Sequence, residues 1–142
     1  DWELSKKFNA KVCGVTANNE KIVLAKPMTF MNDSGQAVQL LMHFYKLAPR
    51  DLILIHDDKD IPLGEIKIQT DRGSAGHNGV RSIIEHIGGQ NFTRLRVGIA
   101  SENKKKMVDA ADFVLSKFGL LERKKTADVI ERAVEEVKRL II

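Results

Sequence analysis

The chain has 142 residues and a formal net charge of +4, and 43% of its residues are hydrophobic. These values suit one folded domain with one core and exclude a disordered, fibrous or membrane-spanning chain. Its single cysteine, Cys13, excludes an intrachain disulfide and favours the reducing cytoplasm as the location. The positive charge favours a polyanionic partner without requiring one.

The first part of the chain predicts two strands followed by a helix. Two β-rich runs, 8–15 and 21–25, are separated by a short polar turn and are expected to form strands. Pro27 ends the second of these strands. Ser34 is expected to cap a helix whose apolar residues recur at three- and four-residue spacing until Pro49.

The middle of the chain predicts strands on both sides of a further helix. The apolar run 51–56 lacks alternation, as expected for a strand covered on both faces, and it breaks into a loop at 57–64. Residues 65–70 alternate polar and apolar, as in a strand with one wet face. An apolar stripe over 80–87 predicts a helix that two glycines end, and 95–99 resembles another strand.

The last part of the chain predicts two helices. A short one is expected around 108–115, and in the long final one Ile130, Val134, Val137 and Ile141 share a face. Strands that alternate with helices indicate the α/β class. The prediction is a single-domain three-layer sandwich with a twisted mixed β-sheet flanked by helices.

An imidazole and a carboxylate follow the most apolar predicted strand. Ligands of open α/β sheets gather at the carboxyl ends of strands, which is where His56 and Asp57 come. An aspartate there can orient an imidazole and favour its charged form, as an acid that supports a histidine base does. The same residues suit a turn, or a metal site formed by His56, Asp57, Asp58 and Asp60. Because the cluster lacks a recognised metal-ligand spacing, no metal is predicted.

A loop of small residues at 73–79 leads into the predicted second helix. Such a loop can present backbone N–H groups to an anion, although this one lacks the spacing of the known phosphate-binding motifs. His77 and Asn78 can donate and accept hydrogen bonds at a ligand. Asn78 suits a helix cap equally well, so both interpretations stay open.

Phe30 and Asn32 are a further pair of candidates. An aromatic beside an amide in a loop suits stacking on a base and hydrogen bonding to a ribose or peptide. Taken alone, Phe30 suits a core anchor better. Basic residues group at 104–106 and 123–125, and each group taken alone indicates a solvated face.

Three stretches together resemble the bacterial-type peptidyl-tRNA hydrolases, in the same order and at fitting separations. They are KPMTFMNDSG at 26–35, IHDDKDIPLG at 55–64 and GSAGHNG at 73–79. The run FTRLRVGI at 92–99 also resembles the next strand of that family. The resemblance covers nearly the whole chain, and three motifs in order are specific where each alone is not.

The resemblance implies hydrolysis of the ester that joins a peptide to the 3′ ribose of tRNA, which recycles tRNA from aborted translation without a metal or cofactor. It implies that Asp57 stabilises the catalytic histidine. Other residues are expected to contact the 3′ end, the peptide or the phosphates of the acceptor stem of peptidyl-tRNA. These are Phe30, Asn32, His77, Asn78, Lys67, Arg94, Arg96 and Lys105. A cytoplasmic monomer without a membrane partner is expected.

The family begins with a strand, a Gly-Asn-Pro-Gly turn and a helix that carries the catalytic histidine, and residues 1–142 contain none of these. None of His43, His56, His77 and His86 takes the place of that base. We therefore expect a single peptidyl-tRNA hydrolase-like domain over 1–142 that lacks its N-terminal strand–helix unit and hydrolyses its substrate poorly. The alternative is a non-catalytic module of the same fold that binds RNA or a protein.

Overall fold

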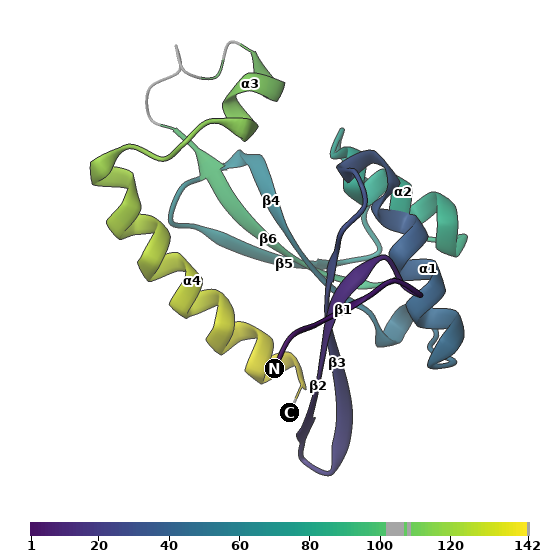
Figure 1. The fold of residues 1–142 in the computed structure, drawn as a ribbon. Coiled ribbons are helices and arrows are strands. Elements are labelled where there is room, and N and C mark those ends of the chain that lie inside the picture. Colours follow the sequence, from purple (N-terminus) through teal and green to yellow (C-terminus); the bar gives the residue numbers. More distant parts are fainter. Residues whose placement is uncertain (102–106, 108, 142) are drawn as a thin grey trace. The chain divides into compact units, whose positions relative to one another are not determined.

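The structure, a computed structural model, describes residues 1–101, 107 and 109–141, which form two compact units (Figure 1). The first unit contains β1 (Glu3–Ser5), β2 (Ala10–Ala17), β3 (Glu20–Pro27), the 3-10 helices η1 (Met31–Asp33) and η2 (Pro49–Asp51), α1 (Ser34–Phe44) and α2 (Asn78–Ile87). The second contains β4 (Ile53–Pro62), β5 (Ile66–Thr70), β6 (Thr93–Ala100), α3 (Ala110–Leu115) and α4 (Leu120–Ile141). The α/β class is confirmed, whereas a single domain over 1–142 stays a prediction.

The sheet of the first unit is an antiparallel meander in the order β1-β2-β3. The two predicted strands are confirmed as β2 and β3, whose pairing runs from Ala10 opposite Pro27 to Ala17 opposite Glu20. Asn18 and Asn19 both take positive φ, 51° and 63°. Two such residues form the tight turn whose twist matches that of a hairpin, and asparagine tolerates this conformation better than most side chains.

One face of this sheet packs on α1. The core of the first unit is made of apolar side chains from the β1–β2 connection, β2, β3 and α1, with Tyr45 just after the helix. They are Phe8, Ala10, Val12, Val23, Ala37, Leu41 and Tyr45. The predicted three- and four-residue spacing therefore does place the apolar stripe of α1 on the strand pair.

The start and end of α1 differ from the expectation. Ser34 is the first residue of the helix, and its hydroxyl donates to the Met31 carbonyl at 2.8 Å. The prediction that Ser34 caps the helix is wrong, because this hydroxyl is turned back toward η1 instead of accepting from the first turn. The helix ends at Phe44, well before Pro49, since Lys46 takes the left-handed conformation with φ 54°.

The helices α1 and α2 approach each other at Gly35. Its N–H donates to the Ser82 hydroxyl at 2.9 Å, and an added Cβ would lie far inside van der Waals contact with the Ser82 carbonyl. We expect Gly35→Ala to lower the free energy of unfolding by about 1–3 kcal/mol, because the clashing atom belongs to the backbone and cannot rotate away. Urea unfolding measures this change. Gly89→Ala is the control, since its Cβ would meet no atom within 4 Å.

The sheet of the second unit has the order β4-β6-β5, and β4 runs parallel to β6. The register is regular from Ile53 opposite Thr93 to Asp58 opposite Gly98, and it shifts before Pro62 pairs with Ala100. The expected loop at 57–64 is therefore wrong for most of its length. The charged run continues β4 because side chains of β6 supply partners for it, as described below.

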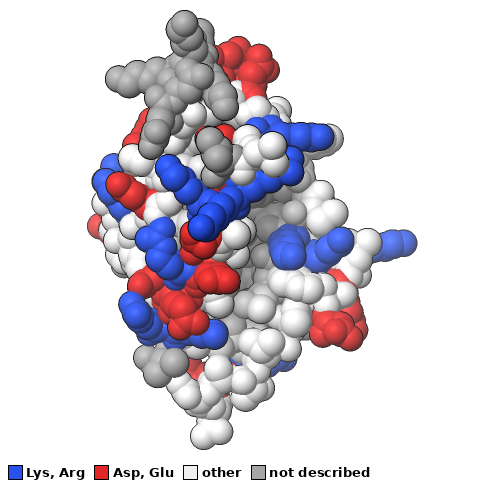
Figure 2. Space-filling view, turned by 90° about the vertical axis from the view of Figure 1, so that its left-hand side faces the viewer, with Lys and Arg blue, Asp and Glu red and all other residues white. Residues whose placement is uncertain are grey.

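The helix α4 packs against β6, and its Val129 side chain is buried. The predicted apolar face is partly wrong, since Ile130 and Val134 are exposed while Val129, Ala133 and Val137 turn inward. Figure 2 shows acidic and basic side chains interspersed over the face that carries α4. Within the described residues, the structure has no helix long and apolar enough to cross a membrane.

Candidate functional site

The first unit brings together the start of α2 and the turn η1. The two elements are in contact, and a Cβ added at Gly79 would lie 2.6 Å from the Met31 sulfur and 3.1 Å from the His77 ring. Glycine at this position therefore allows the close approach. We call the four predicted binding residues on these two segments the amide cluster: Phe30, Asn32, His77 and Asn78.

Phe30 is 87% exposed. The interpretation of Phe30 as a core anchor is therefore wrong, because a core aromatic loses most of its contact with water. Asn32 on η1 is also exposed. An exposed ring two residues from an exposed amide can stack on a base while the amide forms hydrogen bonds to the same ligand.

The cap of α2 is His77, not Asn78. The His77 ring accepts from the Val80 N–H through Nδ1 at 3.2 Å, so the proton of the neutral ring lies on Nε2. The Asn78 Oδ1 accepts from Arg81 Nη2 at 3.2 Å. The alternative that Asn78 serves as the cap is therefore wrong. Arg81 instead holds the oxygen of the Asn78 amide, and the N–H groups of that amide form the end that can donate to a ligand.

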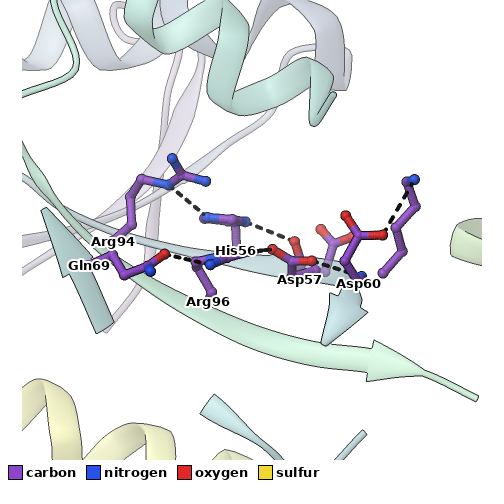
Figure 3. Close-up of polar contacts among 8 residues, drawn as sticks. His56, Asp57, Asp60, Gln69, Arg94 and Arg96 are labelled. Carbon is purple, nitrogen blue, oxygen red and sulfur yellow. Dashed lines mark hydrogen bonds and ion pairs between the residues drawn. The ribbon is translucent and has the colours of Figure 1, made fainter. Parts of the chain in front are cut away.

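The second unit carries a network of polar groups from β4, β6 and β5 (Figure 3). We call it the strand network; it consists of the Asp57 carbonyl and the side chains of His56, Asp58, Gln69, Arg94 and Arg96. The Arg94 Nε–H donates to His56 Nε2 at 3.1 Å, and the His56 Nδ1–H donates to the Asp57 carbonyl at 2.8 Å. Each ring nitrogen therefore has its own partner, and the histidine ring lies between the Arg94 side chain and the backbone of Asp57.

Asp58 and Arg96 form a buried ion pair in the same network. Arg96 donates to Asp58 Oδ2 through Nε at 2.8 Å and through Nη2 at 2.7 Å, and its Nη1 donates to Gln69. The Asp60 N–H donates to the other carboxylate oxygen at 2.8 Å. Burial acts to raise the pKa of Asp58, but the Asp60 N–H and Arg96 outweigh it and hold that pKa below its ordinary value.

Asp57 lies on the opposite face of β4 from His56 and Asp58, because side chains alternate along a strand. Its side chain is partly exposed, whereas His56 and Asp58 are buried. The strand therefore separates a buried, charge-paired face from a face that presents one carboxylate. This arrangement suits an acid that orients a histidine base.

The predicted phosphate contacts divide into different environments. Lys67 is exposed on β5, whereas Arg94 and Arg96 are 0% and 5% exposed and engage His56, Asp58 and Gln69. A phosphate role for the two arginines stays a prediction that requires them to leave these partners. Lys105 lies outside the described residues.

Several site residues were missed at the level of sequence, namely Met31, Gln69 and Arg81. The strand network has a sequence signal, because Leu54, His56 and Asp58 share one face of β4 and Arg94 and Arg96 share one face of β6. Pairing β4 with β6 in this register would have matched Arg94 and Arg96 with His56 and Asp58. Met31 and Arg81 have no comparable signal.

The metal interpretation of 56–60 finds no support in the part of the chain that the structure describes, where no group of three or more His, Cys, Asp or Glu side chains is placed to hold an ion. The reason lies in the hydrogen bonds. The Nε2 lone pair of His56 faces Arg94, and both oxygens of Asp58 accept from Arg96 and the Asp60 N–H.

Comparisons with known proteins agree with the motifs. A family model described as Peptidyl-tRNA hydrolase matches residues 1–142. The peptidyl-tRNA hydrolase of Lactiplantibacillus plantarum is 48% identical over 79% of this chain and 59% of its own length. That of Aquifex aeolicus is 44% identical over 97% of this chain and 68% of its own length. The chain thus spans about three fifths to two thirds of these relatives.

Solved structures give the same result. The crystal structure of peptidyl-tRNA hydrolase from Acinetobacter baumannii aligns with a TM-score of 0.87 at 36% identity, over 97% of this chain and 69% of that one. A complex of peptidyl-tRNA hydrolase with N-propanol aligns with a TM-score of 0.89 at 35% identity, over 99% and 70% of the two chains. The chain belongs to the bacterial-type peptidyl-tRNA hydrolase family.

Proposed function

We propose that the protein hydrolyses the ester between the peptide and the 3′ ribose of tRNA in peptidyl-tRNA, as a cytoplasmic monomer. The observation that carries this proposal is the family match over the whole of 1–142, in a chain that has Asn32, Asp57 and Asn78 within the motifs that resemble the family. The exposed Phe30 adds support, since a stacking surface suits the bases at a tRNA 3′ end.

In the proposed reaction a histidine base takes a proton from water, and the water oxygen attacks the ester carbonyl carbon. The tetrahedral intermediate then releases the ribose 3′ oxygen, which takes up a proton, and the peptide leaves with a free carboxylate. Asp57 accepts a hydrogen bond from the base and stabilises the imidazolium while it holds the proton. Asn32 and Asn78 bind the substrate in the geometry of attack.

The histidines of this chain support a base that lies outside residues 1–142. Both ring nitrogens of His56 are engaged, His77 caps α2, and His86 Nδ1 donates to a backbone carbonyl at 2.8 Å. His43 lies near the C-terminal end of α1, about 14 Å along the helix axis from the end next to Asn32. We therefore propose that residues 1–142 alone bind the substrate without turning it over efficiently.

The test compares two proteins: residues 1–142, and the full-length gene product, meaning these residues with whatever flanking residues the open reading frame encodes. Release of peptide from a labelled peptidyl-tRNA measures hydrolysis, and filter binding measures affinity. We expect the full-length gene product to be at least about 10²-fold faster than 1–142, which is the low end of what a positioned base contributes. Both are expected to bind tRNA.

Each other outcome has a definite meaning. Equal rates would show that the base lies within 1–142. Binding without hydrolysis by the full-length gene product would contradict the proposed activity and favour the non-catalytic binding module. Activity that a strong chelator abolishes would favour a metal-dependent reaction instead.

A further inference from the structure

We propose that His56, held by Arg94, is a positioning residue for Asp57. The proposal rests on the proposed function, because Asp57 acts in that reaction. Neither His56 nor Arg94 is placed to touch the ester in this proposal. They act through the backbone of the residue that carries the carboxylate.

The hydrogen bonds fix one form of the His56 ring. A carbonyl oxygen only accepts, so Nδ1 must carry a proton to donate to Asp57 at 2.8 Å. A guanidinium only donates, so Nε2 must offer a lone pair to Arg94 at 3.1 Å. The ring is therefore the neutral Nδ1–H tautomer, and the direction of both bonds runs from Arg94 through His56 to the Asp57 carbonyl.

The strand pairing explains how the three groups meet. Leu54 lies opposite Arg94 and His56 lies opposite Arg96 in the parallel register, so Arg94 and His56 are diagonal neighbours on one face. Both side chains are buried, at 0% and 9% exposure, so water competes little for the two bonds. A buried arginine that donates to a histidine keeps that ring in one orientation.

The position of Asp57 in β4 explains why an added backbone bond matters there. The regular ladder continues only one residue further, to Asp58, before the register shifts. The orientation of the Asp57 carbonyl defines the ψ angle of Asp57, and the side chain of the same residue projects from the opposite face of the strand. Holding that carbonyl therefore limits the directions that the carboxylate can take. A displacement of about 1 Å in a catalytic group can cost about 10²-fold in rate.

The first test is nitrogen-15 NMR of the histidine rings in residues 1–142 at neutral pH, which needs no activity. His56 is expected to show a protonated Nδ1 and an unprotonated Nε2. His77 provides an internal comparison with the opposite tautomer, since its Nδ1 accepts from the Val80 N–H. A His56 ring with Nε2 protonated would overturn the proposal.

The second test uses two variants of the full-length gene product. His56→Asn keeps an amide donor where Nδ1 stands and loses the acceptor for Arg94. His56→Gln keeps an acceptor where Nε2 stands and loses the donor to Asp57. We expect His56→Gln to be the more stable variant but to lose at least about tenfold in kcat, while His56→Asn keeps kcat within about threefold. KM is expected to change little in either variant.

A positioning role predicts that His56→Gln has the higher Tm of the two variants and the lower kcat, whereas a merely structural role predicts that kcat falls with Tm. If kcat follows Tm, or if His56→Gln turns over like the wild type, the positioning role is overturned. If the wild-type full-length gene product shows no hydrolysis, the proposed function fails and the positioning role with it, whereas the NMR result still decides whether the hydrogen-bonded chain exists.

Discussion

Asp57→Asn in the full-length gene product is expected to lower kcat for peptidyl-tRNA hydrolysis by about 10²- to 10⁴-fold. Asparagine keeps the shape of the side chain but loses the negative charge that stabilises an imidazolium. The protonated base is then less stable, because no negative charge lies beside it. The asparagine amide can donate as well as accept, so it no longer fixes the tautomer of the histidine ring. Steady-state hydrolysis at saturating substrate measures kcat. Filter binding is expected to give a tRNA affinity within about threefold of the wild type, because Asp57 serves the base rather than the RNA.

Asp60→Asn is the matched control for this variant. It makes the same chemical change three residues along the same strand, on a side chain that is 61% exposed and 3.9 Å from Lys59. Exposed ion pairs contribute little, so kcat and stability are expected to stay close to those of the wild type. Equal losses in both variants would indicate a general effect of charge, and an unchanged kcat in Asp57→Asn would remove Asp57 from the mechanism.

Local patterns predicted the parts of the fold whose signals are local. The hairpin of β2 and β3 follows from two β-rich runs and an Asn-Asn turn, and α2 ends where Gly88 takes φ 79°. The strand β4 was predicted only up to residue 56. Aspartates, Pro62 and Gly64 are all turn formers, and nothing within 57–64 reveals that Arg96 on β6 neutralises Asp58. A partner distant in sequence overrides the local preference there.

The candidate site divides in the same way. The motifs placed Asn32 in a loop and Asn78 at a helix start, and the structure has them in η1 and at the first residue of α2. Asp57 was predicted in a loop just after a strand, whereas it lies within β4. The choice between His77 and Asn78 as the cap of α2 could not be predicted, because both side chains can accept from the helix N–H groups. The burial of Arg94 and Arg96 was not predicted either, because an arginine is rarely buried without a partner and its partners become apparent only once β4 is paired with β6.

Arg96→Met is expected to lower the free energy of unfolding of residues 1–142 by about 3–5 kcal/mol at neutral pH. The loss arises because Asp58 stays buried with its negative charge and without its cation. Urea unfolding followed by circular dichroism measures it. The double variant Arg96→Met with Asp58→Leu removes both charges, so it is expected to recover part of the loss, as other buried ion pairs do when both partners become apolar.

The pH dependence of these proteins tests the same ion pair independently. Because the folded-state pKa of Asp58 lies below its ordinary value, the pair stabilises the protein above that value and the stabilisation is lost as the pH falls through the folded-state pKa. Without Arg96, burial raises the pKa of Asp58 in the variant, so the variant takes up this proton at a higher pH than the wild type does. The advantage of the wild type over Arg96→Met is therefore expected to shrink as the pH falls from neutral, and to be lost once the pH has also passed the lowered pKa of Asp58 in the wild type. A difference that stays constant from neutral pH to strongly acidic pH would show that Arg96 stabilises the unit by packing and not by its charge.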